Sequence, residues 1–241
     1  MWRLRSVLIS APAIILITAV MGTIASICSI WDKRGVTQHW LARKWSQMLL
    51  ACAFAKRKAS GVEKLDPHGT YVLVANHASF LDIPVILSEL PVEIRFFAKK
   101  SLFTIPFIGW YLSRGHLEVE RGDARSSLKS MLEGAKLIKE RGISVLLFPE
   151  GGRSPEKMRP FIEGAAYIAI KAGVPIVPIG LVNTRGVLPM HSMLLRPGNI
   201  EIHVGDPIDT AGMTPRDRGQ LNETLHRQVA ALAREAVPSA A

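Results

Sequence analysis

The sequence predicts an α/β fold, in which a mostly parallel central sheet is flanked by helices, joined to an amino-terminal membrane-associated helical element. From about Gly61 onward, short β-prone runs alternate with segments of helical periodicity. Several of these runs are continuously apolar, as expected of parallel strands covered on both faces. A third observation predicts the membrane element, because Ser6 to Ile30 contains no charged residue.

The apolar stretch Ser6–Ile30 is long enough, as a helix rising about 1.5 Å per residue, to cross a hydrocarbon core of about 30 Å. A cleaved signal peptide fits less well, because the run exceeds the usual length of about 7–15 residues and no clean cleavage site follows. As a single span, the helix would leave the rest of the chain in the cytoplasm, because most nearby basic residues follow it. A re-entrant helix hairpin on one leaflet fits equally well.

A second helical segment is expected over Val36–Ala55, where Trp40 and Trp45 accompany basic residues. It is either an interfacial helix or an ordinary amphipathic helix packed on the domain. Nine basic residues and one acid lie within residues 1–58, so this segment carries +8 of the net charge of +10. We expect residues 1–58 to form a membrane helix or helix hairpin that contacts anionic lipid headgroups, and residues 59–241 to form the α/β domain.

The α/β domain is expected to contain six strands and four helices. The strands are Tyr71–Ala75, Ile94–Ala98, His116–Val119, Ile143–Phe148, Ile176–Gly180 and Ile200–Val204. The helices are Ser79–Leu90, Asp123–Arg141, Phe161–Ala172 and a last one that begins at Thr214-Pro215 and ends near Ala236.

A histidine and a carboxylate lie in the turn after the strand Tyr71–Ala75. His77 follows the strand, and Asp82 comes five residues later. Residues at the carboxyl ends of such strands face a crevice, where a histidine with an orienting carboxylate can act as a general base. Asp82 also has a structural interpretation, since Ser79 to Asp82 has the form of a capping box. The two roles are compatible.

A glycine-rich turn, Phe148–Ser154, follows another predicted strand. Its glycines expose backbone N–H groups and Arg153 adds a fork of donors, which suits a phosphate or an oxyanion. The alternative is a plain glycine turn with a surface arginine, since no Walker-type Gly-Lys-Ser/Thr follows.

Other chemistries have little support in the sequence. No Cys/His spacing suits zinc, so neither a metal nor another cofactor is expected. No Gly-x-Ser-x-Gly elbow is present, which argues against a serine hydrolase. A nucleic-acid partner is not expected, because the basic residues lie beside an apolar run and do not form a stripe on the α/β domain.

Four motifs in order resemble those of the glycerolipid acyltransferase family, over roughly Tyr71 to Ile179. Lys99 through Trp110 resembles its lysophosphatidate acyltransferase branch, the bacterial PlsC type. The motifs are Asn76-His77 with Asp82, Gly115 to Arg121, Phe148 to Ser154, and Val174 to Ile179.

The resemblance implies an O-acyltransferase that moves an acyl group from acyl-CoA or acyl-carrier protein to the sn-2 hydroxyl of lysophosphatidate. His77 would be the general base and Asp82 its orienting partner. The acceptor-binding residues would be Lys99, Arg121, Glu150, Gly151, Gly152 and Arg153, with Arg153 on the phosphate. The expected location is the bacterial inner membrane, with the catalytic domain on the cytoplasmic side.

Two positions depart from the family pattern. Gly152 stands where threonine is usual, and Glu118 where phenylalanine is frequent. The acceptor is therefore less firmly implied than the reaction. Glycerol-3-phosphate, another lysophospholipid or an ornithine lyso-lipid are alternative acceptors, and a non-catalytic lipid-binding protein is an alternative of a different class.

Overall fold

The computed structural model describes residues 1–99, 101, 103–104, 109, 112–113, 116–119, 124–154 and 156–235. Seven strands form one sheet in the order β1-β7-β6-β2-β5-β3-β4. Their bounds are β1 Ala55–Ser60, β2 Val72–Ala75, β3 Ile94–Lys99, β4 Leu117–Val119, β5 Ser144–Leu147, β6 Ile176–Val182 and β7 Gly198–Val204. All neighbouring strands are parallel except β6 and β7, which confirms the prediction of a mostly parallel sheet.

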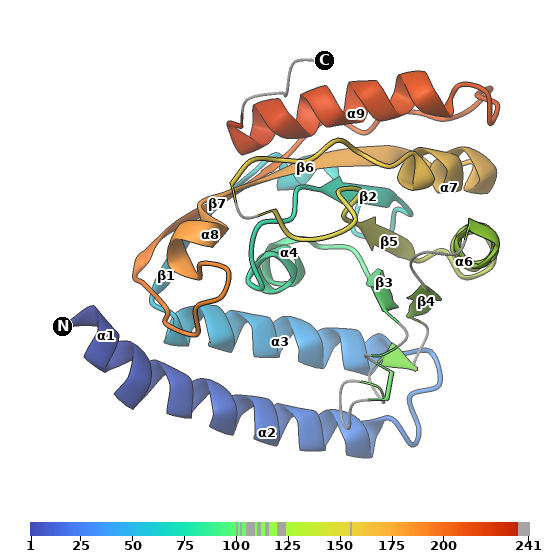
Figure 1. The fold of residues 1–241 in the computed structure, drawn as a ribbon. Helices are drawn as coiled ribbons and strands as arrows, with labels where there is room; N and C mark the ends of the chain where they lie inside the picture. The colour runs from blue at the N-terminus through green and yellow to red at the C-terminus, as the bar shows by residue number, and fades with distance from the viewer. Residues whose placement is uncertain are drawn as a thin grey trace.

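Helices cover both faces of the sheet (Figure 1). On one face lie α3 (Val36–Cys52) and α4 (Asp82–Glu89); on the other lie α6 (Ala124–Arg141), α7 (Gly164–Ala172) and α9 (Arg218–Ala233). The central strand β2 alternates between the two cores: Leu73 and Ala75 pack with α3 and α4, while Val72 and Val74 pack with the helices opposite. This double burial explains why the strand is continuously apolar. Two short helices, η2 (Val62–Lys64) and α8 (Thr184–Val187), lie in the connections between strands.

The amino terminus forms one long helical stretch from Trp2 to Cys28, made of α1 (Trp2–Arg5), η1 (Ser6–Ser10) and α2 (Ala11–Cys28). Among the described residues it is the one helix long and apolar enough to cross a membrane, with a mean hydropathy of 2.3. Only 6% of its most apolar 18-residue segment is buried, which is consistent with membrane association.

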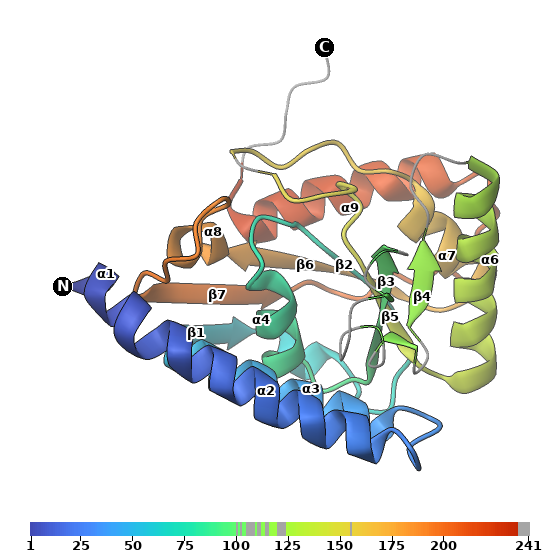
Figure 2. The same cartoon turned by 60° about the horizontal axis from the view of Figure 1, so that its bottom comes forward.

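The amino-terminal stretch lies alongside α3 in both views (Figures 1 and 2). Trp45 Nε1 donates to Thr18 Oγ1 at 3.0 Å, and Gln38 Nε2 donates to the carbonyl of Ala25 at 2.8 Å. In the connecting turn, the Asp32 carboxylate accepts hydrogen bonds from the first N–H groups of α3. The two helices therefore form a hairpin against the α/β domain.

Strand β1 was not expected from the sequence, and it crosses the boundary suggested at residue 58. It contains Lys56, Arg57 and Lys58 and is exposed along nearly its whole length, so it lacks the apolar pattern of a strand. Its position is fixed by the partner, because it pairs in register with β7 from Ala55↔Gly198 to Ser60↔His203. It forms one edge of the sheet.

Three helices begin three or four residues later than the sequence suggested, and one of them is α7, which begins at Gly164 and not at Phe161. The other two begin after a turn that a carboxylate holds. The helix expected from Ser79 begins at Asp82, and the helix expected from Thr214 begins at Arg218. In each case a carboxylate holds the residues before the helix in a turn: Asp82 accepts from the N–H of Ser79, and Asp217 accepts from the N–H and hydroxyl of Thr214. The expected capping box at Ser79 is thus half formed, since Ser79 Oγ accepts from the N–H of Leu81 and not from that of Asp82.

Candidate active site

The candidate site lies at the carboxyl ends of β2 and β5, which are adjacent parallel strands. His77 follows β2 and Glu150 follows β5, so the sheet brings together two segments that are far apart in the sequence. The backbones of the two segments also touch directly, because the N–H of Ser154 donates to the carbonyl of His77 at 2.8 Å. This edge of a parallel sheet is where side chains converge on a ligand.

His77 and Asp82 form a hydrogen-bonded pair, as the sequence suggested. His77 Nδ1 lies 2.8 Å from Asp82 Oδ2, and the Asp82 side chain is completely buried. The same oxygen accepts from the N–H groups of Ala78 and Ser79, at 2.7 and 2.9 Å. A carboxylate held by two backbone donors orients the ring with Nδ1–H toward it. Nε2 then carries the free lone pair, and no described residue hydrogen-bonds to it.

The ring of Phe148 fixes the plane of the imidazole. The two rings are stacked with centroids 4.1 Å apart and an interplanar angle of 19°. The His77 side chain keeps 17% of its surface exposed, so the supported ring still reaches solvent. Phe148 comes directly before Pro149 in the glycine-rich turn, so this turn also helps to position the His77 imidazole.

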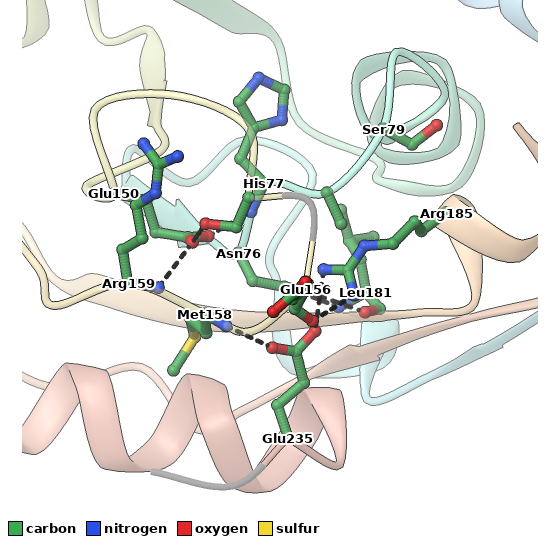
Figure 3. Close-up of polar contacts among 12 residues, drawn as sticks. Asn76, His77, Ser79, Glu150, Glu156, Met158, Arg159, Leu181, Arg185 and Glu235 are labelled. Carbon is green, nitrogen blue, oxygen red and sulfur yellow. Dashed lines mark hydrogen bonds and ion pairs between the residues drawn. The ribbon is translucent and has the colours of Figure 1, made fainter. Parts of the chain in front are cut away.

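Glu150 is buried and its carboxylate is bonded to the protein. Oε1 accepts from the backbone N–H of His77 at 2.6 Å. Oε2 accepts from the hydroxyl of Ser154 at 2.7 Å and from the backbone N–H of Arg159 at 2.9 Å, and Figure 3 shows the bond to Arg159. A single carboxylate therefore joins the turn that carries His77 to the loop that follows β5.

The glycine turn brings Arg153 to the His77 turn. Gly151 has a φ of +71°, a left-handed conformation that glycine adopts without strain. The guanidinium carbon of Arg153 lies 3.5 Å from the centre of the Phe80 ring, which is a cation–π contact. Phe80 lies between His77 and Asp82 in the sequence, so the contact places a cation on the turn that carries His77. Gly152 lies in the same turn and is partly exposed.

Two of the expected phosphate-binding residues are not placed. Lys99 is the last residue of β3, but its side chain lies outside the described residues, and so does the whole of Arg121. In the motif that contains Arg121, His116 is buried and its Nδ1 accepts from the N–H of Phe96. Burial, together with the Arg95 charge, holds the pKa of His116 well below its usual value, which indicates a neutral structural side chain.

Asn76 has a structural role that the sequence did not reveal. Its side-chain amide donates to the carbonyl of Leu181 at 3.0 Å, and its side-chain oxygen accepts from the N–H of Leu181 at 2.8 Å. Asn76 is the first residue after β2, and its side chain continues the pairing with β6 in place of the backbone. It fixes the strand end from which His77 projects. An Asn at the end of an apolar strand was the available signal.

Comparisons with known proteins relate the chain to an enzyme family. A family model described as Acyltransferase matches residues 32–182. The chain is 36% identical, over 86% of its length, to a chloroplastic 1-acyl-sn-glycerol-3-phosphate acyltransferase of Brassica napus. It is 40% identical, over 83% of its length, to a 1-acyl-sn-glycerol-3-phosphate acyltransferase of Chlamydomonas reinhardtii. The chain spans 61% and 59% of the lengths of these relatives.

A solved structure shares the fold. It is the 1-acyl-sn-glycerophosphate acyltransferase PlsC of Thermotoga maritima, with a TM-score of 0.78 and 24% sequence identity. The alignment covers 98% of this chain and all of that one. The likeness extends over the amino-terminal helices as well as the sheet, and it confirms the expected α/β architecture with an amino-terminal apolar helix.

Proposed function

Because the chain belongs to the acyltransferase family, we propose that it is an O-acyltransferase that acylates the sn-2 hydroxyl of 1-acyl-sn-glycerol-3-phosphate, giving phosphatidate for phospholipid biosynthesis. The donor is acyl-CoA or acyl-carrier protein. The observation that carries the proposal is the His77–Asp82 pair, with its free Nε2 next to the Arg153 turn. The names of the relatives support the choice of acceptor.

In the proposed reaction His77 acts as the general base. Its Nε2 takes the proton of the acceptor hydroxyl while the oxygen attacks the thioester carbonyl. Collapse of the tetrahedral intermediate breaks the C–S bond, and the imidazolium returns the proton to the departing thiolate. A thiol has a pKa of about 8.5, so the leaving group needs little acid assistance. Buried Asp82 stabilises the imidazolium, and a nucleophilic serine is not needed.

Arg153 is proposed to bind the acceptor phosphate. Its guanidinium is held on the Phe80 ring, within the turn that carries His77, and a guanidinium matches a phosphate with two parallel hydrogen bonds. Gly151 and Gly152 leave room for the ligand beside it. Lys99 and Arg121 are proposed to add positive charge, as the family resemblance implies. Glu150 is proposed to contribute by holding the site together, since its oxygens face protein donors.

The amino-terminal helices are proposed to hold the enzyme on an anionic membrane, the cytoplasmic side of a bacterial inner membrane. The stretch from Trp2 to Cys28 exposes large apolar side chains such as Ile15 and Leu16, at 69% and 65%. Of the two arrangements compatible with the sequence, the structure favours the re-entrant hairpin. Hydrogen bonds from α3 to Thr18 and Ala25 would be lost if the first helix turned away to span the bilayer.

An acceptor panel with both donor types tests the proposal. Membranes that contain the protein are incubated with labelled acyl-CoA or acyl-carrier protein and one acceptor at a time: lysophosphatidate, glycerol-3-phosphate, another lysophospholipid or an ornithine lyso-lipid. We expect phosphatidate to be the main product. Faster acylation of a different acceptor would reassign the substrate, and lipid binding without turnover would favour a non-catalytic protein.

A further inference from the structure

The loop after Arg153 is held against the site at several points. The Glu150 carboxylate accepts hydrogen bonds from the hydroxyl of Ser154 and from the N–H of Arg159. The N–H of Ile162 donates to the carbonyl of Pro149. On the other side, the Glu235 carboxylate accepts from the N–H of Met158 at 2.8 Å (Figure 3). The backbone around residues 158 and 159 is therefore fixed relative to His77.

Arg159 and His77 are tied to opposite oxygens of one buried carboxylate. The N–H of His77 donates to Oε1 of Glu150 at 2.6 Å, and the N–H of Arg159 donates to Oε2 at 2.9 Å. Figure 3 shows the imidazole of His77 and the guanidinium of Arg159 on the same side of that carboxylate. Arg159 is exposed, and no described residue forms an ion pair or a side-chain hydrogen bond with its guanidinium.

The other cations of this region are arranged differently. Arg185 is engaged by the protein, since it donates to the carbonyl of Glu156 and pairs with Glu235. Arg153 rests on the Phe80 ring. Lys157 is exposed but precedes buried Met158, and its backbone has no bond to Glu150. Arg159 therefore combines a fixed backbone, a guanidinium without an acidic partner among the described residues and a position on the His77 side of Glu150.

We propose that Arg159 binds a phosphoryl group of a substrate beside His77, as a second guanidinium in addition to Arg153. The inference rests on the proposed function, in which both substrates bear phosphate. The acceptor carries a phosphomonoester, and the donor carries the phosphodiester of a phosphopantetheine arm or the diphosphate of CoA. A rigid fork of N–H donors binds either group by charge-assisted hydrogen bonds.

The test compares Arg159→Ala and Arg159→Lys with the matched control Lys157→Ala, which removes the same charge from the same loop. The Michaelis constants for lysophosphatidate and for the acyl donor are measured separately for each protein. Arg159→Ala should raise the KM of one substrate by roughly 10-fold to 100-fold, as expected for loss of a charge-assisted pair. The substrate whose KM rises identifies the phosphoryl group. The KM of Arg159→Lys should lie between those of the wild type and Arg159→Ala, because an ammonium keeps the charge but lacks the fork of donors.

Two results would overturn the inference. One is an unchanged KM for both substrates in Arg159→Ala. The other is an equal rise in Lys157→Ala, which would indicate general surface charge. A wild-type protein without turnover would instead refute the proposed function. In that case the role of Arg159 is tested by equilibrium binding of lysophosphatidate and of acyl-CoA to the wild type and to Arg159→Ala. Equal binding by the two proteins would reject a role for Arg159.

Discussion

The backbone N–H of His77 donates to the carboxylate of Glu150 at 2.6 Å, so the proposed base is held by a residue from a different strand. The second oxygen of that carboxylate holds the loop that carries Arg159. The base and the proposed phosphate-binding loop therefore share one buried anchor. A shift of the Glu150 carboxylate would move both His77 and the loop that carries Arg159, because both Glu150 oxygens accept hydrogen bonds from protein donors.

We expect Glu150→Gln to destabilise the protein and lower kcat. The amide replaces one oxygen by an NH₂ group that would face either the N–H of His77 or the donors of Ser154 and Arg159. A buried donor without an acceptor costs about 1–3 kcal/mol, which thermal or urea unfolding would detect. The control is Glu156→Gln, since that side chain is exposed in the same loop. An unchanged stability with a higher acceptor KM would show instead that Glu150 binds the acceptor.

We expect Asp82→Asn to lower kcat by about 10²–10⁴-fold while the protein stays folded. An asparagine oxygen can still accept from the backbone N–H groups of Ala78 and Ser79, but it lacks the charge that stabilises an imidazolium. Asp206→Asn is a matched control, because Asp206 is 86% exposed and pairs only with Lys64 among the described residues. Steady-state turnover similar to the wild type in Asp82→Asn would remove the carboxylate from the mechanism.

The protein should lose stability as the pH falls from about 6.5 toward 4, in part because of His39 on α3. Burial, together with the charges of Arg95 and Arg43, lowers the pKa of His39 to about 4. In this pH range His39 becomes protonated in the unfolded chain but stays neutral in the folded chain. The stability contributed by neutral His39 is therefore complete above pH 6.5 and is lost as the pH falls, by up to about 3 kcal/mol.

Thermal unfolding at several pH values would check the role of His39. His39→Gln should flatten the dependence between pH 6.5 and 4, whereas His68→Asn, at an exposed position, should leave it unchanged. An equally steep loss of stability in His39→Gln would assign the effect to other groups.

Charges on the exposed face of α2 should weaken membrane binding without unfolding the domain. Ile15 and Leu16 are mostly exposed, so Ile15→Glu with Leu16→Glu disturbs little internal packing. We expect binding to phosphatidylglycerol-containing vesicles, measured by sedimentation, to fall at least about tenfold. Leu132→Glu, at an exposed position of α6 on the opposite face of the sheet, is the control. Unchanged vesicle binding in the double variant would argue against this docking surface.

The architecture and the His77–Asp82 pair were largely accessible from the sequence. Apolar runs such as Tyr71–Ala75 are visible because strands buried on both faces need no polar alternation. The His77–Asp82 pair was accessible for a related reason, since both residues belong to one short turn whose ends are fixed by a strand and a helix. Their hydrogen bond is a local consequence of that turn.

The parts that escaped prediction depend on partners distant in the sequence. Strand β1 is a run of mostly exposed residues, half of them basic, and it becomes a strand only because β7 offers a free edge. The bonds of Glu150 to His77 and to Arg159 require β2 and β5 to be adjacent, which the order of elements alone does not specify. The position of Arg159 followed from those bonds and from no motif.

His77 is proposed to remove the acceptor proton at a phosphate-binding site on a membrane. The most direct test is phosphatidate formation from lysophosphatidate by the wild type and by His77→Ala, in membranes, with acyl-CoA and with acyl-carrier protein as donors. The proposed mechanism predicts product with the wild type and a loss of about 10²–10⁴-fold in turnover with His77→Ala. No phosphatidate from the wild type with either donor, or full turnover by His77→Ala, would contradict it.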